Sequence, residues 1–253
     1  MTAKLKRIRP ASFYLAVLLA LTLAILLCDL VLNDDVAVIF QEGHSIEVTS
    51  ALLLFSGVFL WFWLGAATHD RRNWHIPLIL LLMALREKDF DVRFTSAKLL
   101  QFRLYTGDSS LWEKAIGAMV IGLILWCAVR LAVINLPNWL RGLMRLSSVS
   151  WLVGSAGLLL VIAKSLDGIE RKLADFNVAL PRDSVVLAGR VEELLEMVMA
   201  LMLAQAVTIF STSLNQLPSG LGTTSGSRHC SANSALAWGQ TGGTAPSELL
   251  PRQ

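Results

Sequence analysis

The chain has 253 residues, of which 55% are apolar and 16% charged, and its mean hydropathy is +0.59. Because a typical soluble domain has about 25% charged residues, this composition excludes a disordered or fibrous chain and disfavours a soluble globular enzyme. The net charge of +3 gives no indication of nucleic-acid binding, and three cysteines are too few for a disulfide framework. The composition indicates an integral membrane protein surrounded by lipids.

Six apolar runs predict membrane-crossing helices. They cover residues 11–32, 47–68, 74–88, 115–136, 147–166 and 191–210. A helix rises ~1.5 Å per residue and the hydrocarbon core of a bilayer is ~30 Å thick, so most of these runs are long enough to cross it. No run alternates polar and apolar residues with a period of two, which disfavours a β-barrel. We therefore predict an all-α fold, with a helical membrane domain over residues 1–210.

The first run follows a basic segment, Lys4 to Arg9, and no small-x-small cleavage motif comes after it. These features favour a retained helix over a cleaved signal peptide. Because basic segments stay on the cytoplasmic side, we expect the N-terminus there. The location that we expect is a bacterial inner (cytoplasmic) membrane.

The third run is short. Its uncharged part, 73–85, has 13 residues and covers only ~20 Å. If it crosses, Lys and Arg divide equally between the two sides, and the positive-inside rule does not fix the orientation. If it dips in and returns, the basic segments 86–114 and 164–190 become cytoplasmic and the rule is better satisfied. We favour six crossings because lone re-entrant segments are uncommon and 33–46 carries no Lys or Arg.

Two further segments lie outside the apolar runs. Between the third and fourth runs, the spacing of apolar residues predicts one amphipathic helix that ends near Thr106 and either lies on the membrane or packs on the bundle. Its apolar face comprises Phe90, Phe94, Ala97, Leu100 and Leu104. Residues 211–253 are rich in Ser, Thr and Gly, and we expect a disordered tail there.

Charged residues gather at the ends of three apolar runs, in segments 86–93, 164–171 and 190–196. Because consecutive crossings alternate in direction, these segments lie on one side of the membrane, together with the start of the second run if six runs cross. Ionisable groups within a membrane cost ~2.5–3.5 kcal/mol each on insertion scales, so they need partners or a function. We predict an acidic-basic pocket at this face. The candidate residues are Glu47, Arg86, Glu87, Asp89, Asp167, Arg171, Glu193 and Glu196.

Three functions are consistent with such a pocket. In the leading one, the carboxylates bind a cation, a proton or a small solute, and Arg86 and Arg171 tune them. In the second, the protein is an enzyme that acts on a lipid or polyprenyl headgroup, with the arginines holding phosphate. In the third, the protein is a non-catalytic assembly or interaction protein and the charges form structural ion pairs. Besides membrane lipids, a small cation or solute is the partner that we expect.

Motifs of known membrane enzymes are incomplete in this sequence. Glu192-Glu193 matches the start of the EExxxR motif of intramembrane prenyl-protease-like enzymes, but Met197 stands at the arginine position. No cofactor motif is evident. None of the four histidines lies in the charged clusters, so we expect no transition-metal site. We expect His69 and His75, which flank a short charged loop, to be solvated at headgroup level.

Overall fold

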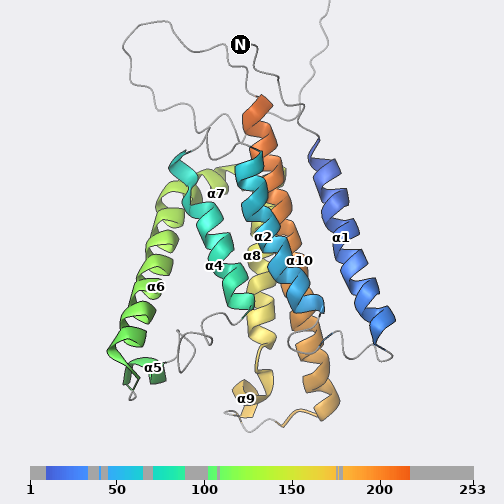
Figure 1. The fold of residues 1–253 in the computed structure, drawn as a ribbon, viewed down its shortest axis with the longest axis vertical. Coiled ribbons are helices and arrows are strands. Elements are labelled where there is room, and N and C mark those ends of the chain that lie inside the picture. Colours follow the sequence, from blue (N-terminus) through green and yellow to red (C-terminus); the bar gives the residue numbers. More distant parts are fainter. Residues whose placement is uncertain are drawn as a thin grey trace, which may run out of the picture.

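A computed structural model describes residues 10–33, 40, 45–64, 71–88, 102–106, 109–174, 176 and 179–216. Its helices, in chain order, are α1 (Ala11–Leu32), α2 (Ser45–Trp63), the short turn η2 (Arg71–Asn73), α4 (His75–Glu87), α5 (Phe102–Thr106), α6 (Leu111–Arg130), the π-helical turn η4 (Leu131–Asn135), α7 (Leu136–Met144), α8 (Ser148–Leu166), α9 (Ile169–Ala174) and α10 (Arg182–Gln216). No strand occurs within these ranges, so the predicted all-α class is confirmed (Figure 1).

Five helical segments are long and apolar enough to cross a membrane. They are α1, α2, the continuous helix Leu111–Met144, α8 and α10. The shorter α4 is the sixth helix of the bundle. It begins beside η4, where His75 contacts Asn135, and it ends beside the start of α2, where Lys88 contacts Glu47. Over its 13 residues it therefore runs antiparallel to α2 and does not turn back (Figure 1).

Two helices begin earlier than the apolar pattern predicts. Ser110 caps α6 because its hydroxyl accepts a hydrogen bond from the Glu113 amide and donates one to the Glu113 carboxylate. α10 begins after Pro181, whose carbonyl accepts hydrogen bonds from the backbone amides of Ser184 and Val185. α10 also continues to Gln216, so the first six residues of the expected tail are helical. Residues 217–253 lie outside the described residues.

Only the end of the predicted amphipathic helix is described, as α5. Leu104 is fully buried there, and its side chain and that of Tyr105 pack against Gly117 of α6. This end of the segment therefore packs on the bundle. The other members of its predicted apolar face, Phe90, Phe94, Ala97 and Leu100, lie outside the described residues.

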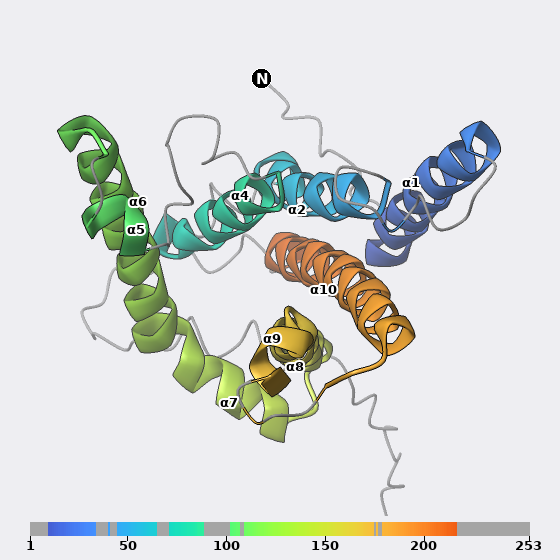
Figure 2. The ribbon, with the colours of Figure 1, turned by 90° about the horizontal axis from the view of Figure 1, so that it is seen from below.

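The core lies between α2 and α10, with α4 and α1 packed against them. Gly57 permits the close approach, because an added Cβ would lie 3.2 Å from Leu80 Cδ1 and 3.5 Å from Ala204 Cα. Further along, Trp61 of α2 stacks on Phe210 of α10 with 5.6 Å between ring centroids. In the view from below, α4, α6, α7, α8 and α10 are arranged in a ring (Figure 2). Polar side chains gather at two faces of this bundle, one near the start of α4 and the other near the ends of α4 and α8.

Candidate functional site

Described members of the predicted clusters gather where α2 begins and α4 and α8 end, at what we call the acidic face. Four helices contribute to a group of side chains that we call the acidic pocket. Its members are Glu47 of α2, Glu87 and the adjoining Lys88 of α4, Lys164 and the adjoining Asp167 of α8, and Glu192, Glu193 and Glu196 of α10.

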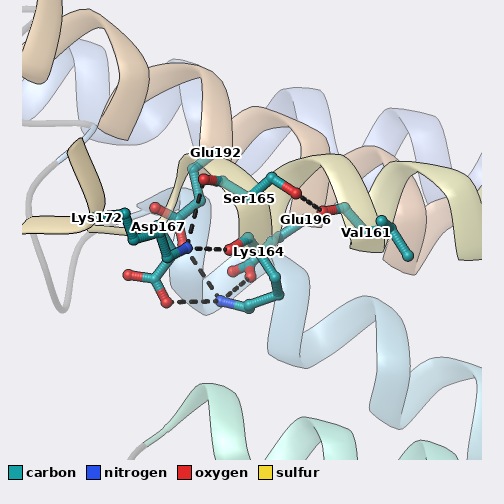
Figure 3. A network of polar contacts seen from close by, with 7 residues as sticks. All are labelled: Val161, Lys164, Ser165, Asp167, Lys172, Glu192 and Glu196. Carbon is teal, nitrogen blue, oxygen red and sulfur yellow. Dashed lines mark hydrogen bonds and ion pairs between the residues drawn. The ribbon is translucent and has the colours of Figure 1, made fainter. Parts of the chain in front are cut away.

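Lys164 is the centre of this pocket (Figure 3). Its Nζ lies 2.6 Å from Glu196 Oε1, 3.2 Å from Glu192 Oε1 and 3.7 Å from Asp167 Oδ2. The side chain of Glu196 is only 8% exposed, whereas that of Lys164 is 31% exposed. One ammonium group is thus shared by three carboxylates. Glu192 and Glu196 lie four residues apart on one face of α10, a spacing at which like charges repel unless a cation lies between them.

The local fold at the end of α8 fixes the position of Lys164. The helix ends at Leu166 with Asp167 as its C-cap, and Gly168 follows with a φ of +61°, a conformation that favours glycine. The chain then turns into α9, which carries Lys172. The Lys172 amine donates hydrogen bonds to the backbone carbonyls of Lys164 at 2.8 Å and Ser165 at 3.4 Å. It thereby caps carbonyls that have no partner within the helix.

A second ion pair joins α4 to α2. Lys88 Nζ lies 3.0 Å from Glu47 Oε1, and both side chains are partly buried. The preceding residue, Glu87, lies within the electrostatic reach of Glu196 and Lys164. Glu193 in turn interacts with the charges of Glu196 and Glu47. Among the described residues the pocket therefore combines six carboxylates with two lysines, and the nearby Arg86 adds a third positive charge, so the formal charge of the group is negative.

The structure sorts the eight predicted site residues into three groups. Five lie in the acidic pocket: Glu47, Glu87, Asp167, Glu193 and Glu196. Arg86 and Arg171 have exposed side chains, although the charge of Arg86 also acts on Glu87. Asp89 lies outside the described residues.

Three pocket members were absent from the predicted set: Lys88, Lys164 and Glu192. A sequence signal existed for Lys164, because the repelling Glu192–Glu196 pair requires a cation and Lys164 closes the neighbouring apolar run. Within the described ranges, no group of three or more His, Cys, Asp or Glu side chains is arranged to hold a metal ion. The ammonium of Lys164 occupies the space between the carboxylates.

A second polar group, which we call the His75 cluster, lies at the opposite face. It comprises Asn73, His75, Arg130 and Asn135. The expectation of a solvated His75 is wrong, since this side chain is fully buried. Arg130 Nε donates to His75 Nδ1 at 3.3 Å, and His75 Nε2 lies 2.8 Å from Asn135 Oδ1. This network assigns the neutral tautomer that carries its proton on Nε2.

The π-helical turn η4 explains how this cluster forms. In a π-helix the backbone bond joins residues five apart, as the bond from the Leu136 amide to the Leu131 carbonyl does here. Arg130 and Asn135 are also five apart, so the turn brings both side chains to α4. The guanidinium of Arg130 lies 5.3 Å from the ring centroid of Trp126 and 6.0 Å from that of Trp74. A hydrophobicity pattern based on an α-helical period does not predict this alignment.

Comparison with known proteins gives no family for these two clusters. No family model, curated protein or solved structure matches the chain. The functional interpretation therefore depends on the composition of the acidic pocket and on its position at one end of an apolar helical bundle.

Proposed function

We propose that this integral membrane protein binds protons or a small cation in the acidic pocket, as part of handling an ion or solute. One observation carries the proposal: the single ammonium of Lys164 is shared by three carboxylates, those of Asp167, Glu192 and the buried Glu196. The pocket thus has more carboxylates than one lysine can neutralise.

The chemistry of such a pocket favours uptake of positive charge. Carboxylates that share a site of low dielectric cannot all ionise without cost, and burial adds a penalty for each charged form. A proton on one carboxylate, or a cation between two of them, relieves both effects. In this proposal Lys164 serves as an internal counter-ion, and an incoming cation competes with its ammonium for Glu192 and Glu196.

The alternative of a lipid-headgroup enzyme has less support. It requires Arg86 and Arg171 to hold a phosphate together, but Lys164 rather than an arginine lies among the carboxylates. The alternative of a purely structural ion-pair network predicts a different response to substitution, which the experiment below measures. We further propose a bacterial inner membrane with a cytoplasmic N-terminus, which would place the acidic pocket at the outer face.

Proton flux into liposomes tests the proposal. The purified full-length protein is reconstituted into liposomes that enclose a pH-sensitive dye, and flux is measured under an imposed proton, sodium or potassium gradient. Glu196→Gln keeps the size of the side chain but removes the buried charge. Glu170→Gln is the matched control, because Glu170 is exposed on α9 and lies outside the pocket.

We expect flux above that of protein-free liposomes for the unaltered protein and for Glu170→Gln. For Glu196→Gln we expect at least tenfold less flux at equal insertion. Normal flux with a lowered melting temperature in Glu196→Gln would instead identify the ion pairs as structural. Flux no greater than that of empty liposomes under every gradient, together with equal proton uptake by both proteins in acid titration, would refute the proposal.

A further inference from the structure

A cavity of about 500 Å³ lies inside the ring of helices, and the function proposed above does not use it. Its wall is formed by α4, α8 and α10, by Trp61 of α2, and by the segment that runs from α6 through η4 to α7. Representative lining residues are Leu80, Ala132, Asn135, Val153, Gly157 and Leu203. Ligand sites in proteins typically have volumes of ~300–1,000 Å³, so this cavity is large enough for a ligand.

The lining of the cavity is almost entirely apolar. Asn135 is the polar exception on η4, and its side chain already bonds within the His75 cluster. The indole of Trp139, also in the wall, donates its N–H to the carbonyl of Ser150 at 2.9 Å. Apolar cavities do not hold water well, since a water molecule needs two to four polar partners. The wall therefore favours an occupant made of hydrocarbon.

The length of the cavity matches one acyl chain. Along α8 its wall extends from Val149 to Leu160, which corresponds to ~17 Å at ~1.5 Å per residue. Half of a bilayer's hydrocarbon core is ~15 Å thick, and a lipid chain fills that half. The wall ends one turn before Lys164, so a chain would reach close to the acidic pocket without entering it.

One cation, Arg130, lies beyond the opposite end of the cavity, beside two tryptophan side chains. Asn135 lines the cavity and bonds His75, and His75 accepts a hydrogen bond from Arg130. Trp74 and Trp126, which stack near the Arg130 guanidinium, are 47% and 41% exposed. Half-exposed tryptophans are typical of the headgroup region. A positive charge at that level complements the phosphate of an anionic lipid.

We infer that this cavity binds one acyl chain of an anionic phospholipid, whose phosphate lies near Arg130. The lipid is available from the surrounding bilayer. α6 and α8 are connected by η4 and α7 and do not pack extensively against each other. These two helices therefore lie apart in the ring (Figure 2). The inference is independent of the ion-binding proposal, because the two sites share no residue.

Photocrosslinking tests this inference on the full-length protein in vesicles. The vesicles contain phosphatidylcholine with a trace of phosphatidylglycerol that carries a diazirine at mid-chain, and labelled peptides are identified by mass spectrometry. Gly157→Phe fills the cavity, because an added Cβ at Gly157 meets nothing within 4 Å. Gly122→Phe is the matched control: its added Cβ also meets open space, but Gly122 does not line the cavity.

We expect labels in segments 149–160 and 199–210. In Gly157→Phe we expect at least a fivefold loss of label at these segments, with Gly122→Phe unchanged. Arg130→Gln should reduce labelling by phosphatidylglycerol towards the level given by a phosphatidylcholine probe. Equal labelling of Gly157→Phe and the unaltered protein, both monodisperse after purification, would overturn the inference. Equal labelling of the unaltered protein by the phosphatidylglycerol and phosphatidylcholine probes would overturn the inference that the site prefers an anionic headgroup.

Discussion

At the scale of single residues, the pair Lys164–Glu196 is asymmetric. The carboxylate is almost buried and the lysine is one-third exposed, so the two partners depend on each other to different degrees. Lys164 can turn to water if its partner is lost, because its long side chain reaches the surface. Glu196 has no such route, and losing Lys164 leaves a buried charge.

We therefore expect Lys164→Met to lower the free energy of unfolding by about 1–3 kcal/mol, between the ~3–5 kcal/mol of a broken buried pair and the ~0–1 kcal/mol of an exposed one. The double variant Lys164→Met/Glu196→Gln should recover most of this loss, because it removes the stranded charge as well. Denaturant titration in detergent measures these two variants and Glu196→Gln, and the double-mutant cycle isolates the pair. A double variant no more stable than Lys164→Met would contradict this account.

The buried imidazole of His75 gives a second prediction. His75→Phe fills the space but leaves Arg130 Nε and Asn135 Oδ1 without this partner, and stranded buried polar groups cost ~1–3 kcal/mol each. We expect a melting temperature several degrees lower, because ~1 kcal/mol shifts the midpoint by ~2–4 °C in a chain of this size. His75→Asn should be less harmful, since its amide can both donate and accept. Equal stability of His75→Phe and the unaltered protein would show that the cluster contributes nothing.

At the scale of helices, close packing at Gly57 brings α2, α4 and α10 together. We expect Gly57→Leu to force these helices apart and to lower stability by about 1–3 kcal/mol, as overpacking of a well-packed core does. Gly122→Leu is the control, since the same side chain would meet open space on α6. Thermal unfolding of both variants measures the difference. The packing argument is wrong if the two variants unfold at the same temperature.

Much of the helical framework could be predicted from the sequence, because apolar length determines where a helix can cross. The first run, 11–32, coincides with α1. Helix starts that depend on capping, at Ser110 and Pro181, were missed because both precede the apolar residues. The gathering of acidic residues at one face could be predicted because successive membrane-crossing helices alternate in direction. The sequence narrows their cation to a few lysines and arginines at the same face, including Lys164. The choice among them depends on how far the side chain of Lys164 reaches between helices, and the His75 cluster depends on a π-helical turn.

At the scale of the whole molecule, six crossings would place successive loops on alternate sides of the membrane. We expect cysteines introduced as Leu32→Cys and Ser110→Cys, in a chain whose native cysteines are replaced, to react with an impermeant maleimide from the same side. Arg145→Cys should react from the other side, because it follows the next crossing. All three residues are exposed. Labelling of positions 32 and 110 from opposite sides would mean that α4 returns to the side on which it starts.

The short α4 has an electrical consequence. It has 13 residues, so only ~20 Å of helix separates the buried His75 from the ion pair at Lys88. Water and headgroups that follow these polar ends inward would shorten the insulating layer beside α4 from its usual ~30 Å. The membrane voltage would then fall over about two-thirds of the ordinary distance, which strengthens the local field by about half.

A whole charge that crosses the membrane gains ~2.3 kcal/mol per 100 mV on any path. A charge that moves a short distance beside α4 would cross a larger fraction of the membrane voltage than it would in a layer of ordinary thickness. We therefore expect occupancy of the acidic pocket to respond to voltage.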